Sequence, residues 1–500
     1  MTKINIKQTF NLAIQYHQKN NLNEAKKIYL QILKINPNHV NAHNNLGAAY
    51  KQLGEIEKAK SCFEKVIQLN PNDVDGHNNL GLLLFELKEI QKAKNFFEKT
   101  IQLNPNYVGA HNNLGTIFNE LKEFQKAKDC YERAIQLNPN YVEAHNNLGT
   151  IFKELKEFQK AKDCYERAIQ LNPNYAMALY NLGVIFKQFG LSQKAVGYFE
   201  KAIEINPNYA AAYNGLGIIF EELGNNIKKA KSCFEKALKI NPNYADIYWN
   251  LHSLVSNIDE AIEILKKLIH IDNNHFNAKS MLACLEYFKG NHKNFNNLIN
   301  SNNSNDSYIR SFKWVFSLPK LPKLFFNKKD FFDGVAAISD KSRPFYEFGV
   351  WNGVSFKYLI NTFGRGFGFD TFTGIPEKWH DNPAGTYSSF GSIPQISGGE
   401  FIVGKFEDTL PKFFSKKRSV ASLINFDADL YSSTICALNN TKDIIDEDTI
   451  LVFDEFLMND RWEKDEYKAL EEFCNNFNFS YDVLAVSFYT KQIGVKLKKL

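Results

Sequence analysis

The sequence is poor in the residues that hold small secreted domains together, and it has no long apolar run. Only seven of its 500 residues are cysteine. Four of these recur at one position of a repeat: Cys62, Cys130, Cys164 and Cys233. That spacing gives no disulfide framework and no CxxC metal pattern, so we expect these cysteines to pack as small hydrophobic residues. No apolar segment approaches the length of a membrane span, which favours a cytoplasmic protein.

The chain also lacks a strong excess of charge of either sign. Its 60 basic and 55 acidic residues give a formal net charge of +5 and are spread along the chain. Composition therefore indicates neither a nucleic-acid groove nor a membrane-binding surface. Because 500 residues exceed what one hydrophobic core usually serves, at least two domains are expected.

A short motif that returns at a constant interval organises the first part of the chain. The string Ala-His-Asn-Asn-Leu-Gly begins at Ala42, Ala110 and Ala144, and a variant begins at Gly76. Prolines keep the same step at Pro37, Pro71, Pro105, Pro139, Pro173 and Pro207. A period of about 34 residues predicts a solenoid of helix-turn-helix units. Small residues should allow close helix approach, and aromatic residues should fill the gaps; Gly115 and Tyr131 are examples.

These units resemble the tetratricopeptide repeat over most of residues 1–300. The resemblance implies a superhelix of about eight repeats in this range, with a groove for a protein or peptide. A ladder of asparagines is similar to that of the O-linked N-acetylglucosamine transferase superhelix, which grips a peptide backbone: Asn45, Asn79, Asn113, Asn147, Asn181 and Asn250. A side-chain amide offers a donor and an acceptor together. The alternative is that duplication copied an exposed polar position. The repeated histidines, His43, His77, His111 and His145, should pack or face solvent rather than bind metal.

An α/β domain is predicted for residues 308–500, after a linker without apolar residues near 300–307. Strands are expected near 344–349, 366–370, 401–406, 420–427, 449–454, 480–487 and 489–497. Helical stretches separate most of them until a terminal pair, which predicts a doubly wound, Rossmann-like sheet of seven strands with an antiparallel edge.

Acidic residues follow two of these strands. One apolar run leads into Asp427 and Asp429, and the next ends in Asp454 and Glu455. A crossover helix between parallel strands brings both ends to one edge of the sheet, where such folds bind ligands. Oxygen ligands without His or Cys favour Mg²⁺, Mn²⁺ or Ca²⁺. Alternatively, each acid is a helix N-cap or a surface charge.

A nucleoside site is predicted around the first two strands of this domain. Gly349 and Gly353 follow the first strand, and Asp370 ends the next one, where an acid can bind a ribose diol. The glycine that would contact a pyrophosphate between Gly349 and Gly353 is absent, and Trp351 stands in that loop. A nucleoside without phosphates, such as S-adenosylmethionine, tolerates this better than a dinucleotide.

With these motifs, residues 340–495 resemble the macrocin O-methyltransferase family of class I S-adenosylmethionine-dependent methyltransferases. The most specific match is Asp427-Ala-Asp-Leu-Tyr-Ser-Ser-Thr434. The resemblance implies S-adenosylmethionine as cofactor, bound by Glu347, Gly349, Gly353, Asp370, Glu407 and Asp408. It also implies Mg²⁺ or another divalent cation, bound by Asp427, Asp454 and Glu455. Asp429 is then the general base, because a bound cation makes a hydroxyl proton easier to remove.

A segment between Thr371 and Glu400, rich in Gly, Pro, Ser and aromatic residues, is expected to be a substrate lid. Its candidate residues are Trp379, His380 and Tyr387, with His380 as an alternative base. The expected function is metal-assisted O-methylation of a sugar or glycan hydroxyl, with the repeats recruiting a protein or the substrate. The alternatives are an interaction scaffold with an inactive methyltransferase-like domain, and methylation of a small phenolic acceptor.

Overall fold

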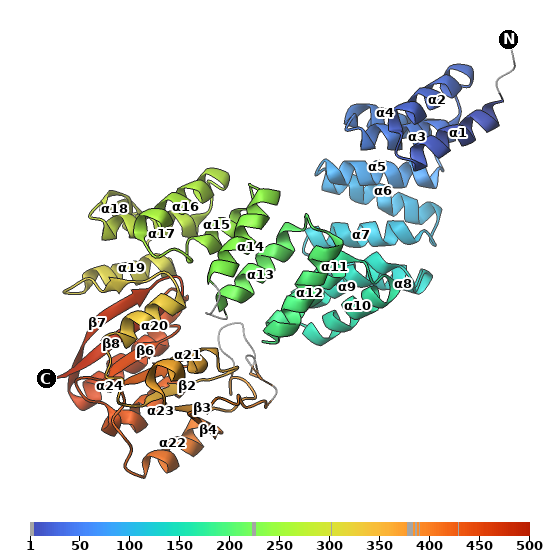
Figure 1. Cartoon of the computed structure of the whole chain (residues 1–500). Helices are drawn as coiled ribbons and strands as arrows, with labels where there is room; N and C mark the ends of the chain where they lie inside the picture. Colours follow the sequence, from blue (N-terminus) through green and yellow to red (C-terminus); the bar gives the residue numbers. More distant parts are fainter. Residues whose placement is uncertain are drawn as a thin grey trace. The chain divides into compact units, whose positions relative to one another are not determined.

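The chain forms two compact units, Met1–Ile185 and Phe186–Leu500 (Figure 1). The structure is a computed structural model that describes residues 5–222, 227–301, 303–377, 384–385, 388–389, 391–428 and 430–500. Within these residues the first unit is helical, and the second combines helices with one mixed sheet. No helix among the described residues is long and apolar enough to cross a membrane.

The N-terminal unit is a series of helix pairs in which first helices of 13 residues alternate with second helices of 14. The helices are α1 (Ile6–Gln18), α2 (Leu22–Ile35), α3 (Val40–Gln52), α4 (Ile56–Leu69), α5 (Val74–Glu86), α6 (Ile90–Leu103), α7 (Val108–Glu120), α8 (Phe124–Leu137), α9 (Val142–Glu154), α10 (Phe158–Leu171) and the start of α11 (Ala176–Gln188). The prediction of an α-solenoid is confirmed.

Glycines at one repeat position let the two helices of a pair approach each other. A Cβ added to Gly115 would lie 2.7 Å from Cε1 of Tyr131, which is buried against it. Gly149 has the same relation to Tyr165. The predicted pairing of a small residue with an aromatic ring is therefore present in both units.

The repeated histidines hold the turn that precedes their own helix. Nε2 of His111 lies 2.9 Å from the carbonyl oxygen of Pro105, and His145 makes the same hydrogen bond to Pro139. His43 and His77 repeat it. Packing, as predicted, accounts for these histidines.

The C-terminal unit contains further helices and the end of α11 ahead of the linker. They are α12 (Ser192–Ile205), α13 (Ala210–Glu222), α14 (Ile227–Ile240), α15 (Ala245–Leu251), α16 (Ile258–Ile271) and α17 (Phe276–Phe288). The short α18 (Lys293–Ile299) follows. Buried residues of α16 and α17, such as Leu265 and Met281, belong to the same hydrophobic cluster as one face of the sheet. The domain boundary near residue 300 stays a prediction.

Among the described residues, the mixed sheet has eight strands in the order β1-β7-β8-β6-β5-β2-β3-β4. They are β1 (Lys323–Leu324), β2 (Phe345–Phe348), β3 (Gly366–Asp370), β4 (Gly399–Val403), β5 (Leu423–Phe426), β6 (Ile450–Phe453), β7 (Phe479–Ser487) and β8 (Gln492–Lys499). Strands β2 to β6 are mutually parallel, whereas β8 lies antiparallel to both β6 and β7. All seven predicted strands are present, and the short β1 is an addition.

Helices cover both faces of this sheet. Their bounds are α19 (Ser307–Ser317), α20 (Lys328–Ala336), α21 (Val354–Phe363), α22 (Phe406–Phe414), α23 (Tyr431–Thr441) and α24 (Glu466–Phe477). Phe331 of α20 and Leu359 of α21 pack in one cluster with Leu423 of β5. Phe413 of α22 and Leu470 of α24 belong to a second cluster. Burial on both faces explains why β6 is apolar throughout, whereas β2 and β5 each contain one buried polar residue, Glu347 and Asn425.

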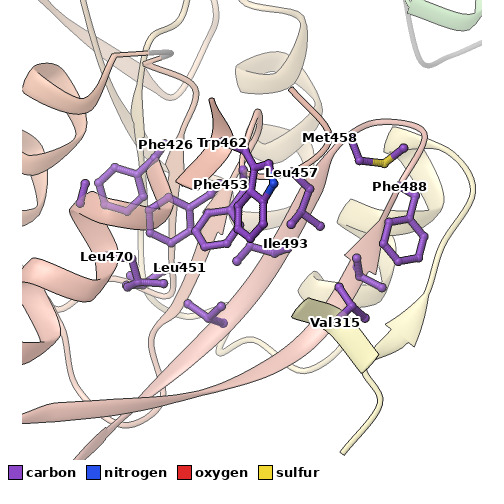
Figure 2. Packing of buried hydrophobic residues seen from close by; sticks show 14 of the residues in the cluster. Val315, Phe426, Leu451, Phe453, Leu457, Met458, Trp462, Leu470, Phe488 and Ile493 are labelled. Carbon is purple, nitrogen blue, oxygen red and sulfur yellow. The ribbon is translucent and has the colours of Figure 1, made fainter. Parts of the chain in front are cut away.

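A row of four phenylalanines lies at the carboxyl ends of the four neighbouring strands β3, β2, β5 and β6. The strand register places Phe348 beside Phe369 on one side and Phe426 on the other, and Phe453 beside Phe426. Their rings are stacked, with neighbouring centroids 4.8, 5.5 and 4.9 Å apart. Figure 2 shows Phe426 and Phe453 in this packed core. The row aligns the four strands at the edge where the predicted site lies.

Candidate functional site

Each phenylalanine of this row is followed directly by a predicted site residue. Asp370 follows Phe369, Gly349 follows Phe348, Asp427 follows Phe426 and Asp454 follows Phe453. Because the four phenylalanines are in register, the four following residues lie along one edge of the sheet. The expected convergence of Asp427 and Asp454 at this edge is therefore present.

A cavity of about 530 Å³ lies at this edge. Six of the predicted site residues line it: Gly349, Asp370, Glu407, Asp427, Asp454 and Glu455. Gly353, Asp408 and Glu347 are not among its lining residues. A volume in this range accommodates a molecule of the size of a nucleoside with a short side chain.

The glycine loop after β2 is held by the acid at the end of β3. Oδ2 of Asp370 accepts hydrogen bonds from the backbone N–H groups of Val350 and Trp351, both at 2.7 Å. Oδ1 accepts a third from Phe372 at 2.6 Å. The carboxylate predicted to bind a ribose diol therefore also fixes the loop beside the cavity, and Trp351 adopts a positive φ of 47° there.

Glu347 belongs to β2, just before this loop, and is fully buried. Its Oε1 accepts a hydrogen bond from the hydroxyl of Ser355, in the first turn of α21. Burial raises the pKa of Glu347 to about 8, although Ser355 and the nearby Lys328 favour the charged form. The structure thus places Glu347 as a support for the start of α21.

The strand-end acids have lysine partners that sequence reasoning missed. Nζ of Lys328, the first residue of α20, lies 3.1 Å from Oδ2 of Asp454 and 3.7 Å from Oδ2 of Asp427. Nζ of Lys491 lies 2.8 Å from Oε2 of Glu455. The side-chain amide of Gln492 donates to the other oxygen of Asp454. Two ammonium groups therefore lie among three carboxylates.

These pairings affect the charge states of the groups. Burial disfavours the charge on Lys328, but the carboxylates of Asp454 and Asp427 outweigh this and raise its pKa. Burial raises the pKa of Glu455, and the charge of Lys491 opposes that shift. Lys328 is consequently an ammonium ion at neutral pH.

The three acids have the oxygen donors that a divalent cation prefers. In the described part of the chain, however, no three His, Cys, Asp or Glu side chains are grouped so as to hold one ion. Oδ2 of Asp427 and Oδ2 of Asp454 both face the Lys328 ammonium, and Oδ1 of Asp454 accepts from Gln492. This arrangement fits an ammonium group better than a divalent ion, so the metal-binding role of Asp427, Asp454 and Glu455 stays a prediction.

The two missed lysines differ in the signal that they left in the sequence. The antiparallel pairing of β8 with β6 puts Ile493 opposite Phe453, so Lys491 and Gln492 come next to Glu455 and Asp454. Pairing the terminal hairpin with β6 in the sequence would have revealed Lys491 and Gln492 as neighbours of these acids. Lys328 comes from a helix before the first predicted strand, and no motif marks it.

The remaining predicted site residues of this domain are Asp429, the candidate base, and the lid residues Trp379, His380 and Tyr387. They lie outside the described residues. Tyr431, at the start of α23, donates a hydrogen bond to Glu472 at 2.5 Å.

The predicted asparagine ladder links successive repeats. Nδ2 of Asn113 donates to Oδ1 of the buried Asn78 of the previous repeat at 3.2 Å. Asn147 makes the same bond to Asn112 at 3.0 Å. Asn79, Asn181 and Asn250 follow the pattern with Asn44, Asn146 and Asn214. Each of these ladder amides donates within the solenoid, and the ladder residues from Asn45 to Asn250 remain half-buried.

Three solved structures are among those to which this chain is similar. A chain of the APC/C hetero-tetramer Cut9-Hcn1 is 19% identical, with 55% of this chain and 54% of that chain covered and a TM-score of 0.47. The present chain thus spans about half the length of that relative. PilF of Pseudomonas aeruginosa is 22% identical, with 41% and 94% covered and a TM-score of 0.38. YrrB, described as a TPR protein with an unusual peptide-binding site, is 23% identical, with 37% and 95% covered and a TM-score of 0.30.

A search of curated proteins found no match. Family models of the tetratricopeptide repeat match residues 40–73, 74–107, 108–141, 142–175 and 176–209. Related repeat models match residues 15–54 and 198–231. Each of the five segments from 40–73 to 176–209 contains one helix pair of the structure, so the N-terminal part of the chain is an array of tetratricopeptide repeats.

Proposed function

We propose that the chain is an S-adenosylmethionine-dependent O-methyltransferase that acts on a sugar or glycan hydroxyl and recruits a protein partner through its repeats. The observation that carries this proposal is the alignment of Gly349, Asp370, Asp427 and Asp454 behind one phenylalanine row, on one cavity. The sheet order, with β8 reversed between β6 and β7, agrees with the methyltransferase fold implied by the sequence resemblance.

The cofactor half of the site is assigned to the glycine loop and Asp370. The loop brings backbone close to the cavity, and the Asp370 carboxylate fixes its conformation through Val350 and Trp351. Glu347 and Ser355 support the helix that begins after the loop. These groups would position a nucleoside, and orientation is a large part of the rate of a methyl transfer.

The acceptor half is assigned to the acids at the ends of β5 and β6. The acceptor oxygen would face the methyl carbon, and a strand-end carboxylate would take its proton; Asp429 is the candidate for that role. Mg²⁺ or another divalent cation at Asp427, Asp454 and Glu455 belongs to the implied family chemistry. Binding such an ion would require Lys328 and Lys491 to leave these carboxylates.

Calorimetric titration of S-adenosylmethionine into the full chain tests this proposal. We expect one site per chain, and an affinity at least tenfold weaker in Asp370→Asn, which exchanges one carboxylate oxygen for a donor. Asp482→Asn, at an exposed carboxylate of β7 paired with Lys498, is the matched control and should bind normally. A folded chain that does not bind the cofactor would overturn the enzyme proposal.

A second candidate function is an interaction scaffold with an inactive methyltransferase-like domain. It is favoured by the engagement of Asp370 with three backbone N–H groups and of Asp454 with Lys328 and Gln492. Failure of cofactor binding would favour this function. If the cofactor binds, transfer of a labelled methyl group to nucleotide sugars and glycans, compared with catechols, separates the sugar acceptor from the phenolic one.

A further inference from the structure

Lys328 occupies the position between two carboxylates where a cation is expected. Its Nζ lies 3.7 Å from Asp427 and 3.1 Å from Asp454, and its side chain lines the same cavity as they do. We propose that Lys328 is the resident cation of the strand-end acids, takes the place of a divalent ion there, and binds the acceptor oxygen. Only the last part, binding of the acceptor oxygen, rests on the proposed methyl transfer.

The backbone at Lys328 is fixed from both sides. Asn327, the buried N-cap residue of α20, accepts a hydrogen bond from the N–H of Asp330 at 2.8 Å and donates to its Oδ2 at 2.9 Å. Before it, Phe325 donates its N–H to the carbonyl oxygen of Val486 at 2.9 Å. After it, Phe331 is buried against the sheet. The ammonium is therefore delivered to the acids by a rigid helix start.

The position is unfavourable for a lysine unless the acids compensate it. A cation at the first residue of a helix faces the positive end of the helix dipole. The carboxylates of Asp427 and Asp454 supply the opposing charge. The charge of Lys328 is thus matched to the strand-end acids rather than to its own helix.

A divalent ion bound by Asp427 and Asp454 would lie beside the Lys328 ammonium. The positive charges of the ion and of the ammonium would repel each other. In addition, Gln492 already donates a hydrogen bond to Oδ1 of Asp454. Glu455, the third predicted ligand, is neutralised by Lys491. The two ammonium groups thus offset two of the three carboxylate charges at this edge without a divalent ion.

Lys328 also has a chemical use in methyl transfer. The acceptor oxygen forms a bond to the methyl carbon while the carbon–sulfur bond breaks, and the electron pair of that bond stays on sulfur. The hydroxyl proton passes to a carboxylate at the same edge. Lys328 keeps its own protons and donates a hydrogen bond to the acceptor oxygen, which stabilises the negative charge that develops there.

Titration of Mn²⁺, followed by electron paramagnetic resonance, tests the proposal on the full chain. We expect no stoichiometric Mn²⁺ binding by the wild type. Lys328→Met should bind one ion per chain, with an affinity at least tenfold higher than any residual affinity of the wild type. Lys329→Met is the matched control, because Lys329 pairs with the exposed Asp333 on α20, and it should behave as the wild type.

Three outcomes would overturn the proposal. The first is one-to-one binding of Mn²⁺ by the wild type that Asp454→Asn abolishes. This outcome does not depend on whether Lys328→Met folds. Equal absence of binding in the wild type and a folded Lys328→Met shows that Lys328 is not what excludes the ion. Loss of wild-type methyl transfer in excess chelator contradicts its catalytic part. Failure of S-adenosylmethionine to bind, measured separately, would instead remove the proposed function and leave the Mn²⁺ result intact.

Discussion

Gly349 and Asp427 meet backbone to backbone at the cavity. A Cβ added to Gly349 would lie 1.8 Å from the carbonyl oxygen of Asp427, and Gly349 has a positive φ of 89°. Its N–H donates to the carbonyl oxygen of Phe369 at 2.9 Å. The loop beside the cofactor half and the strand that carries the acids are therefore one packed structure.

Gly349→Ala should lower the free energy of unfolding by about 3 kcal/mol or more, because it adds a steric clash to backbone strain. Gly364→Ala is the control, since Gly364 also has a positive φ, of 71°, but no atom lies within 4 Å of its added Cβ. Strain alone should cost about 1–2 kcal/mol there. Urea unfolding of the full chain, followed by circular dichroism and tryptophan fluorescence, measures both. Equal losses in the two variants would contradict the contact with Asp427.

Phe426→Ala should lower the free energy of unfolding by about 3–5 kcal/mol, because it opens a cavity in the stacked row. It should also weaken S-adenosylmethionine binding, since Gly349 and Asp427 lose their common support. Phe477→Ala, at the more exposed end of α24, is the matched control and should have a much smaller effect. Denaturant unfolding measures the stability, and calorimetry measures the cofactor affinity. Unchanged cofactor affinity in a destabilised Phe426→Ala would show that the phenylalanine row does not support the cofactor site.

The buried Glu347 should make the C-terminal unit lose stability as the pH rises. Its pKa is about 8 in the folded chain and near 4.5 when unfolded, so unfolding releases a proton between these values. The contribution of the protonated Glu347 to the free energy of unfolding is fully present below pH 4.5. It is lost as the pH rises toward 8, by at most about 1.4 kcal/mol per pH unit. Glu347→Gln should remove this slope in urea unfolding measured from pH 5 to 9. The exposed Glu400→Gln should keep it, and an unchanged slope in Glu347→Gln would contradict the assignment.

Asn113→Ala should destabilise the repeat array by about 1–3 kcal/mol, because the buried Asn78 carbonyl loses its donor. Asn140→Ala, in an exposed turn, provides a comparison that removes an asparagine from the array without removing this bond. Differential scanning calorimetry of the full chain resolves the two effects. Equal unfolding temperatures would show that the ladder does not link the repeats.

The sequence predicted the repeat array because each unit is determined by neighbours within the same repeat or the next one. Gly115 and Tyr131 belong to the two helices of a single pair, so their contact follows from the repeat pattern itself. A central strand such as β6 was likewise predictable, because burial on both faces leaves the continuous apolar run Ile450–Phe453. The acids after β5 and β6 converge because these strands are parallel neighbours joined by a crossover through α23.

What the sequence by itself determined is therefore the local periodicity: helix pairs, strands, and the acids at the strand ends. The tertiary structure decided how the charge of those acids is balanced. Lys328 reaches Asp454 across 126 residues of chain and Lys491 reaches Glu455 across 36. No local pattern specifies such pairs, since they depend on how α20 and the reversed strand β8 pack against the sheet.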